Sequence, residues 1–361
     1  MSLLLTAFLI ASLAAQNTET FGDVSGRAAA AREADDVPRA IQLYRQSVGL
    51  NPKWEEGWWY LGSMLYDSDR YAEGREALAH VVELDAKAGA AWALMGLCEF
   101  ETGDYGQSLV HIERGLASGS PAPQMEEVLR YHEALLLTRT GRFSEALQKY
   151  TWFAKKGARN PELLVGIGLA VLQTRKFPND VRAEQERYAM AGSAAYLNMM
   201  GDSRNAEMAY RKLLEQYPAA PYAHYAYGCF LLGANPEAGI RELRRELQIT
   251  PDAAVAYAML AFALLEQGDS TAALQDAKVA AKEEPESELA QYVLGRSLAE
   301  GGDLKGGIEH LEAAKRLDAA DLQPHISLAT AYSRAGRPVD ARRERRRAVE
   351  MATGVSPIAK P

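Results

Sequence analysis

The residue types that catalyse reactions or bind metals are scattered through this sequence rather than grouped. The six histidines are His80, His111, His132, His224, His310 and His325. His132-Glu133 is followed by Ala-Leu-Leu, so it lacks the second histidine of a zinc-protease motif. Gly166-Ile167-Gly168 lies in an apolar helical pattern and lacks the third glycine and the preceding strand of a phosphate-binding loop. We therefore predict no catalytic, cofactor-binding or metal-binding residues, and no enzymatic activity.

The sequence has two cysteines, Cys98 and Cys229. Two widely separated cysteines make neither a disulfide framework nor a zinc site, and we expect both to be small buried side chains. His224 and His325 fall at positions that other parts of the chain fill with bulky side chains, so we expect them to be packing residues. We therefore expect the function to depend on the organisation of the chain rather than on these cysteines and histidines.

Composition indicates a folded protein with an acidic surface. The chain has 361 residues, of which 48% are hydrophobic and 24% charged, and its net charge is −8. Its one basic concentration lies between Arg334 and Arg347, where the net charge is +5, leaving −13 for the rest. Nucleic-acid binding usually requires a basic surface, because affinity for phosphates comes largely from displaced counterions. We expect no nucleic-acid partner.

An internal repeat organises the chain. Trp58 is followed by Tyr60-Leu61-Gly62, and Trp92 by Leu94-Met95-Gly96, so that the two glycines stand one repeat period apart. Turn glycines recur at Gly103, Gly141, Gly201, Gly268, Gly302 and Gly336, and each is followed five positions later by a small residue, at Ser108, Ala146, Ala206, Ala273, Gly307 and Ala341. Prolines close several units, at Pro52, Pro218, Pro251 and Pro285. A period of about 34 residues is typical of helical repeats that must stack to bury their apolar faces.

This pattern resembles the tetratricopeptide repeat family over residues 21–351. The resemblance implies an all-α fold, a right-handed superhelical solenoid of about nine helix-turn-helix units. We place the units at 21–54, 55–88, 89–122, 127–160, 187–220, 220–253, 254–287, 288–321 and 322–351.

The repeat pattern breaks between residues 161 and 186. Pro161 to Gln173 matches one first helix, and the segment 175–180 then interrupts the pattern. This stretch is either an incomplete repeat or a hinge, and we expect a compact linker with a short helix from Val181. The predicted organisation is an N-terminal array at 21–160, an irregular linker at 161–186, a C-terminal array at 187–351 and a flexible tail at 352–361.

The N-terminus predicts export. Leu3 to Leu13 is an apolar run of signal-peptide length, and Ser12-Leu13-Ala14 supplies a small-x-small cleavage site, so we assign 1–15 as a signal peptide. The n-region has no Lys or Arg, which leaves a buried first helix or a misassigned start as the alternative. No later stretch is long and apolar enough to cross a membrane. We expect a periplasmic or secreted protein, with a cytoplasmic location as the alternative.

In this family the first helix of each unit lines a concave groove, through its second, fifth, ninth and twelfth positions. By analogy, the groove residues here are Trp59, Tyr66, Phe100, Tyr131, Tyr188, Tyr222, Tyr225, Phe262, Tyr292 and Arg296, together with Leu97, Leu135, Leu169 and Asn198. Such an aromatic row suits a peptide or helical ligand, although rings at helical spacing also pack against neighbouring units. The Lys, Arg and Asn clamp of the chaperone-binding members is mostly lacking.

These features predict a protein-interaction scaffold that binds peptide or helical segments of partner proteins and works in envelope assembly or secretion. The alternatives are an accessory subunit that recruits substrates to a separate enzyme and a capture protein for a small molecule or glycan. The arginines from Arg342 to Arg347 have two interpretations. They make a polar cap on the last unit, or they dock to an anionic surface.

Overall fold

The structure is a computed structural model that describes residues 19–118 and 123–353. These residues form nineteen α-helices and one 3₁₀-helix, and no β-strand. The helices are α2 (Phe21–Glu33), α3 (Val37–Leu50), α4 (Glu55–Asp67), α5 (Tyr71–Leu84), α6 (Gly89–Thr102), α7 (Tyr105–Ala117), α8 (Pro123–Thr140), α9 (Phe143–Lys155), α10 (Pro161–Val171), η1 (Pro178–Glu184), α11 (Gln185–Met199), α12 (Ser203–Gln216), α13 (Ala223–Leu232), α14 (Pro236–Ile249), α15 (Ala254–Glu266), α16 (Ser270–Glu283), α17 (Glu288–Glu300), α18 (Leu304–Leu317), α19 (Leu322–Arg334) and α20 (Pro338–Thr353). The predicted all-α architecture of helix-turn-helix repeats is confirmed.

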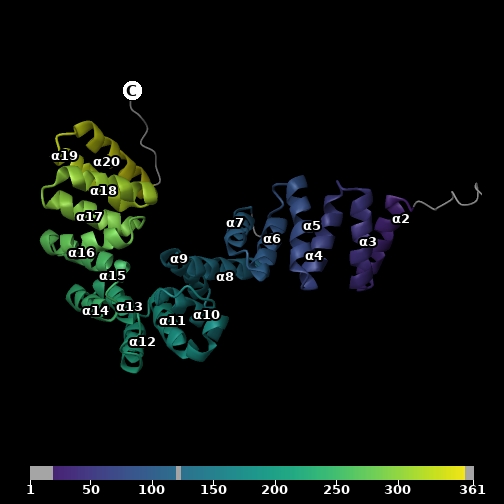
Figure 1. Ribbon diagram of the computed structural model, residues 1–361, viewed down its shortest axis with the longest axis horizontal. Helices are drawn as coiled ribbons and strands as arrows, with labels where there is room; N and C mark the ends of the chain where they lie inside the picture. Colours follow the sequence, from purple (N-terminus) through teal and green to yellow (C-terminus); the bar gives the residue numbers. More distant parts are fainter. Residues whose placement is uncertain (1–18, 119–122, 354–361) are drawn as a thin grey trace, which may run out of the picture. The chain divides into compact units, whose positions relative to one another are not determined.

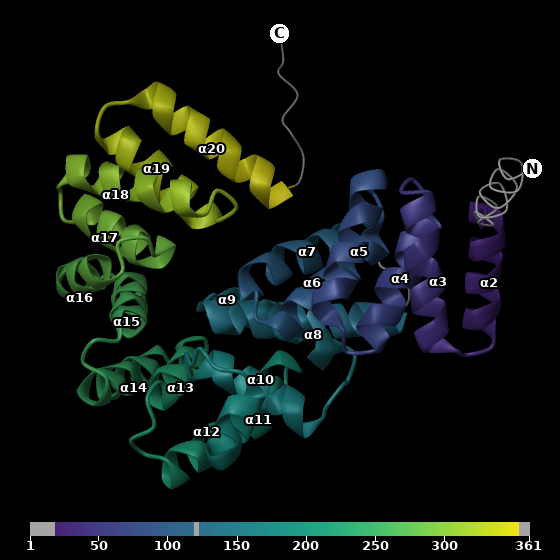
Figure 2. The ribbon, with the colours of Figure 1, turned by 45° about the vertical axis from the view of Figure 1, so that its right-hand side comes forward.

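The helices fall into two compact units, one ending at Tyr150 and the other beginning at Thr151, so the boundary lies inside α9. Within the first unit, the pairs α2–α3, α4–α5 and α6–α7 lie side by side (Figure 1). Within the second unit, Figure 2 shows the pairs from α15 to α20 stacked one on the next. Outside 161–186, each predicted repeat corresponds to one such pair of helices, although α8 and α11 begin before the predicted starts at 127 and 187 and α20 ends after 351.

A glycine and the residue after it make most of the turns within the pairs. All six predicted turn glycines adopt a positive φ, which L-residues with a Cβ rarely tolerate. Where an aspartate follows, it caps the second helix: the Asp303 side chain accepts a hydrogen bond from Gly306 N, at 2.9 Å, and Asp269 accepts one from Ala272 N. The Gly-Asp dipeptide therefore ends one helix and starts the next.

The first two pairs make the same turn without glycine. Asp35 and Asp69 stand two repeat periods and one repeat period before Gly103, and their φ angles are 56° and 57°. Aspartate tolerates this left-handed conformation better than most residues, at some cost in free energy. Because aspartate takes the place of glycine in these turns, the first two repeats lack the turn glycine that marks the later ones.

Small residues let the two helices of a pair approach closely. In α6–α7, the Ser108 hydroxyl donates to the Gly96 carbonyl oxygen across the interface, at 2.7 Å. In α17–α18, a Cβ on Gly295 would lie 2.7 Å from the backbone nitrogen of Leu311. Close approach brings large apolar side chains into contact around these points, and they form the core of each unit.

The segment 161–186 contains α10 and η1, both inside the second unit. Helix α10 packs tightly against α11, because Gly168 and Gly192 face each other's helices: a Cβ on Gly168 would overlap the Tyr188 carbonyl oxygen, and one on Gly192 the Leu164 carbonyl oxygen. These two glycines stand twice as far apart in the sequence as Gly295 and Gly307, the facing glycines of the regular pair α17–α18. Helix α10 therefore has a partner after all, across a longer connection that includes η1.

Two predicted terminal segments fall mainly outside the described residues. Residues 1–15, assigned as a signal peptide, lie there entirely. Of the predicted tail, 354–361 lies there too, whereas Ala352 and Thr353 are the last residues of α20. Among the helices of the described residues, none combines the length and the apolar character that crossing a membrane requires.

Candidate functional site: a polar cavity on α15, α17 and α19

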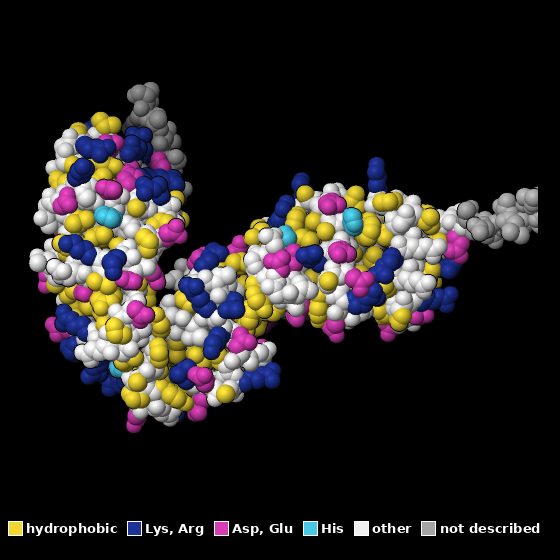
Figure 3. All heavy atoms as spheres, viewed as in Figure 1, with side chains coloured by type: hydrophobic (Ala, Val, Ile, Leu, Met, Phe, Trp, Pro, Cys, Tyr) yellow, Lys and Arg dark blue, Asp and Glu magenta, His cyan; other side chains and the backbone are white. Residues whose placement is uncertain are grey.

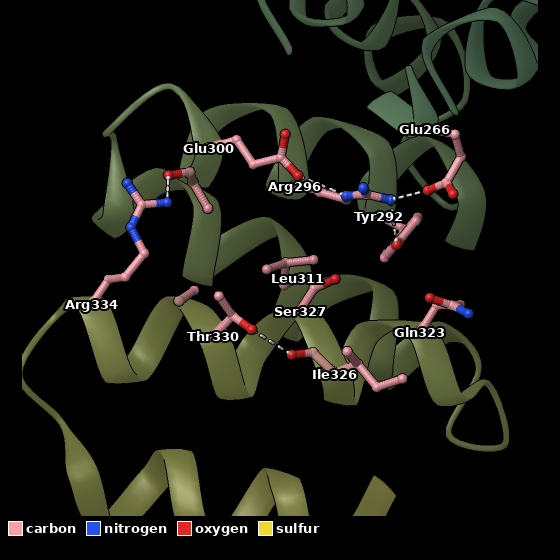
Figure 4. A pocket seen from close by; sticks show the side chains of 12 residues that line it. Glu266, Tyr292, Arg296, Glu300, Leu311, Gln323, Ile326, Ser327, Thr330 and Arg334 are labelled. Atoms are coloured by element: carbon pink, nitrogen blue, oxygen red, sulfur yellow. Dashed lines mark hydrogen bonds and ion pairs between the residues drawn. The ribbon is translucent and has the colours of Figure 1, made fainter. Parts of the chain in front are cut away.

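Three successive first helices of the second unit end at equivalent residues. Helix α15 ends at Glu266, α17 at Glu300 and α19 at Arg334, each one repeat period after the last, and Gly268, Gly302 and Gly336 make the turns that follow. Between these helices lies a cavity of about 320 Å³ (Figure 4). It is lined by Glu266, Tyr292, Arg296, Ala299, Glu300, Leu311, Gln323, Ile326, Ser327, Thr330, Ala331 and Arg334.

Arg296 forms one wall of this cavity and is held by three neighbours. Its Nη1 lies 2.6 Å from Glu266 Oε1, and its Nε lies 2.8 Å from Glu300 Oε1. Nη1 also donates to the Tyr292 hydroxyl, at 3.4 Å. Partial burial disfavours the charged guanidinium, but the hydrogen bonds to both carboxylates outweigh it, so the pKa of Arg296 is raised. This arginine is occupied by intramolecular partners.

The two carboxylates stand at helix ends that disfavour them. Glu266 and Glu300 are the last residues of α15 and α17, where the helix dipole is negative and favours a cation. Arg296 compensates both charges, because it extends from the middle of α17 toward both helix ends (Figure 4). The resulting cluster fixes the shape of this wall.

Arg334 differs from Arg296 in its partners. Its Nη1 donates to the Ala299 carbonyl oxygen, at 2.7 Å, which satisfies one group at the end of α17. Its side chain is exposed, and within the described chain no carboxylate lies within ion-pair distance of its guanidinium. The Arg334 charge is therefore available to a ligand.

The opposite wall belongs to α19. Ile326 contributes an apolar side chain, and the Thr330 hydroxyl donates to the Ile326 carbonyl oxygen, at 3.2 Å. In residues 19–118 and 123–353, no group hydrogen-bonds to the side-chain amide of Gln323 or the hydroxyl of Ser327. The cavity thus combines an apolar surface, two open polar groups and one unpaired cation.

Of the groove residues expected from the sequence, Tyr292 and Arg296 meet in this cavity. Tyr188 and Tyr292 are buried, at 4% and 2% exposure, so their rings are packed within the helix array. The expected groove therefore overlaps the cavity at one helix, α17.

Three further expected groove residues of the second unit, Tyr222, Tyr225 and Phe262, lie just before α13, on α13 and on α15. Phe262 and Tyr225 are partly buried against the core of that unit. Tyr222 precedes α13 with a φ of 63°, where Glu246 accepts hydrogen bonds from the backbone nitrogens of Tyr222 and Tyr225. None of these three residues lines the cavity on α15, α17 and α19.

In the first unit, three of the expected groove residues, Tyr66, Phe100 and Tyr131, contact other rings. Tyr66 meets Tyr71 edge-on, with ring centroids 5.5 Å apart. Phe100 meets Tyr105 at 5.8 Å and His132 at 4.6 Å, both edge-on. Tyr131 and Trp59 are half-buried, and Tyr131 lies edge-on to His132 at 6.1 Å. These contacts place the aromatic side chains of Tyr66 and Phe100 within the packing of the unit.

The sequence reasoning missed most of the cavity, although the signal was present. The second, fifth and ninth positions of the last unit are Gln323, Ile326 and Thr330, and all three line the cavity. The charged residues at Glu266, Glu300 and Arg334 occupy the thirteenth position, one beyond the family's groove positions. The same groove positions in the last unit, and the position that follows them at each helix end, indicate these cavity residues.

The other residue types with catalytic potential have structural partners. His111, His224 and His325 each lie 2.6–2.7 Å from a glutamate of the paired helix. Burial raises the pKa of both the Cys98 and the Cys229 thiol to about 12, so both are protonated at neutral pH and are poor nucleophiles. Across the described ranges, no three His, Cys, Asp or Glu side chains are grouped so as to hold a metal ion.

Comparison with known proteins defines the class. One profile described as tetratricopeptide repeat matches residues 25–88, 61–123, 131–196 and 258–321, and a second profile of that description matches 190–220. Because these matches cover more than half of the chain, it belongs to the tetratricopeptide repeat family.

Among curated proteins, the chain is similar to cellulose synthase operon protein C of Xanthomonas axonopodis pv. citri (strain 306). The two are 29% identical over an alignment of 225 residues, which covers 55% of this chain and 15% of that protein. The chain thus corresponds to only a small part of that relative.

Solved structures give weaker likenesses. The chain is 18% identical to MamA from Desulfovibrio magneticus RS-1, with a TM-score of 0.41, covering 47% of this chain and 96% of that one. It is 17% identical to YrrB, described as a TPR protein with an unusual peptide-binding site, with a TM-score of 0.39 over 48% of this chain and 90% of that one. For yeast Tom70 the identity is 11% and the TM-score 0.36, over 92% and 85%.

Proposed function

We propose that this chain is a protein-interaction scaffold that binds a peptide segment of a partner protein against α15, α17 and α19. The observation that carries the proposal is the cavity of about 320 Å³ with the unpaired Arg334 guanidinium at its edge. The Gln323 amide and the Ser327 hydroxyl supply further hydrogen-bonding groups, and Ile326 supplies an apolar surface. Backbone and side-chain groups of a peptide complement this mixture.

The charges around the cavity define the kind of peptide. Arg296 is neutralised by Glu266 and Glu300, so it shapes the cavity rather than binding an anion. Arg334 is the cation left for a ligand, and a guanidinium binds a carboxylate through paired hydrogen bonds. We therefore propose a segment with one carboxylate opposite Arg334 and an apolar side chain on Ile326.

A displayed library of random dodecapeptides, selected on the full chain, tests this function. Selected peptides should carry an Asp, a Glu or a free C-terminal carboxylate. Arg334→Gln should weaken their binding about tenfold, the effect expected for one lost charge-assisted pair. Lys278→Gln, an exposed cation on α16, is the matched control and should leave affinity unchanged. Equal affinity for the parent and Arg334→Gln would contradict the proposal.

We also propose that the protein works in the cell envelope, in assembly or secretion. Support comes from the apolar run Leu3 to Leu13 and from the partial similarity to cellulose synthase operon protein C. An accessory subunit that recruits substrates to a separate enzyme is one form that such a role would take. Mass spectrometry of the chain isolated from its native cells tests the location. A mature N-terminus at residue 15 or 16 supports export, and an intact Met1 in a cytosolic fraction contradicts it.

A further inference from the structure

A second surface of the chain lies at the C-terminal end of the second unit, on the face of α19 and α20 turned away from α17 and α18. In the pairs α3–α4, α5–α6, α14–α15, α16–α17 and α18–α19, a second helix packs against the first helix of the following repeat. Helix α20 has no following helix among the described residues. In α20, the face that packs against the next repeat in the other second helices is therefore not covered by any described helix.

Residue 345 shows the difference most clearly. It is the ninth residue after its turn glycine, Gly336. The residues at the same place after the other turn glycines and after the two turn aspartates are all buried: Tyr44, Leu78, Ile112, Tyr150, Tyr210, Ala277 and Leu311.

One of these equivalents, Leu311, lies in the same apolar cluster as Leu328 and Ala331, which belong to the following first helix, α19. At residue 345 the side chain is an arginine, which is exposed and lines the groove described next. No helix of the described residues follows to pack on it.

The uncovered face is nevertheless apolar beside that arginine. A groove of about 420 Å³ runs between α19 and α20, and Leu322, Ile326, Ala329, Arg345, Ala348 and Val349 line it. Ile326 is 45% exposed and Val349 is 54% exposed, which is unusual for large apolar side chains that share one groove. A polar cap alone does not require these exposed side chains.

The charges beside the groove are positive. Lys and Arg side chains gather over α19 and α20 in Figure 3, where they are dark blue. Arg343 is paired with Asp340 and Arg347 with Glu350. Within the described chain, Arg342, Arg345 and Arg346 have no carboxylate within ion-pair distance. An occupant of the groove must bring its own carboxylates.

We infer that this face is a docking site for an acidic amphipathic helix of a partner protein. The bound helix would occupy the position that the first helix of a further repeat would take. Its apolar stripe contacts Ile326 and Val349, and its Asp or Glu side chains pair with Arg345 and Arg346. Ile326 and Thr330 line both this groove and the peptide cavity, so the two surfaces are continuous.

Neither the segments of the sequence outside the described residues nor the first helix of a second copy fits this groove. The segments outside the described residues, 1–18, 119–122 and 354–361, contain no Asp or Glu. The first helix of a second copy, α2, has Gly22 and Ala30 among its exposed residues, and these are too small to fill an apolar groove. Charge and side-chain size therefore both favour a separate partner.

A synthetic amphipathic helix of five to six turns, with a leucine stripe flanked by glutamates, is the probe, and fluorescence anisotropy with the full chain is the measurement. The acidic peptide should bind, and a matched peptide with lysines in place of the glutamates should bind at least about tenfold more weakly. Arg345→Glu/Arg346→Glu should weaken the acidic peptide about tenfold or more. The matched variant Arg241→Glu/Arg244→Glu, on α14, should not change its affinity.

Further variants separate the alternatives. Val349→Ser, a change at an exposed position in the groove, should weaken binding of the acidic helix about threefold. Arg334→Gln should leave binding of the acidic helix unchanged. The docking site and the peptide cavity can therefore be disproved independently of each other. Equal binding of the acidic and basic helices would overturn the inference. So would binding confined to vesicles of anionic phospholipid, binding that appears only after deletion of 354–361, or sedimentation showing that the chain self-associates through α20.

Discussion

The same helical framework is used differently in the two units. In the first unit, rings on the groove-side face of α4 and α6 contact other rings, as in the edge-on pair of Phe100 and His132. In the second unit, the equivalent face of α15, α17 and α19 surrounds a cavity with a charged cluster at Arg296 and an unpaired Arg334. A row of aromatic residues in a repeat sequence therefore does not by itself mark the ligand site. Polar groups without internal partners mark it better.

The largest effect should come from removing a packed ring in the first unit. Phe100→Ala should lower the free energy of unfolding of that unit by about 3 kcal/mol, because it removes contacts with both Tyr105 and His132. Urea denaturation measures the change, with Thr330→Ala, on the exposed cavity wall of α19, as the control. A loss below about 1 kcal/mol for Phe100→Ala would mean that the ring projects into an open groove.

Breaking the charged cluster of the second unit should cost less. Arg296→Met should destabilise the unit by about 1 kcal/mol, because the exposed carboxylates of Glu266 and Glu300 would both lose their cation at helix ends that favour positive charge. Adding Glu266→Gln should recover part of the loss, and a double-mutant cycle in urea measures that coupling. Additive losses from the two substitutions would show that the cluster is solvated and shapes nothing.

The second unit also contains a carboxyl whose charge is disfavoured. Burial, together with the nearby Asp321 and Asp318 carboxylates, raises the pKa of Glu288 to about 8. Since this folded-state pKa exceeds the unfolded one, the protonated Glu288 carboxyl contributes its full stability below about pH 4.5. That contribution to the free energy of unfolding is lost as the pH rises through about 8. Glu288→Gln should flatten this fall and stabilise the unit at pH 9 by about 1 kcal/mol, after allowance for solvent screening.

Thermal unfolding of the parent and Glu288→Gln between pH 5 and pH 9 checks this expectation. Glu286→Gln, an exposed neighbour, is the control. Parallel pH profiles for the parent and Glu288→Gln would show that Glu288 ionises normally.

The smallest effect should come from a turn in the first unit. Asp35 holds a φ of 56° where later repeats use glycine. Asp35→Gly should stabilise the first unit by about 0.5 kcal/mol in urea denaturation, because relief of left-handed strain slightly exceeds the entropy that glycine loses on folding. The reverse change in the second unit, Gly302→Asp, should be destabilising. A Gly302→Asp variant more stable than the parent would show that the turns carry no such strain.

The sequence was sufficient to predict the repeats, because Gly-Asp spacing fixes both the end of one helix and the cap of the next. It was not sufficient to predict the packing of α10 on α11. Gly168 and Gly192 stand twice as far apart in the sequence as the facing glycines of a regular pair, so a fixed repeat period does not reveal that they face each other. At the groove, spacing correctly grouped Tyr292 with Arg296. Spacing does not reveal that Tyr188 is buried, or that Arg334 lacks a carboxylate within the described chain, since both facts depend on neighbouring helices.

The central claim is that a peptide binds at the cavity of α15, α17 and α19. Hydrogen–deuterium exchange of the full chain, with and without a saturating peptide selected from the random library, tests it most directly. The account predicts slower exchange in the C-terminal halves of α17 and α19, and loss of that protection in Arg334→Gln but not in Lys278→Gln. Protection confined to α4, α6 and α8 would place the ligand on the aromatic face of the first unit and contradict the account.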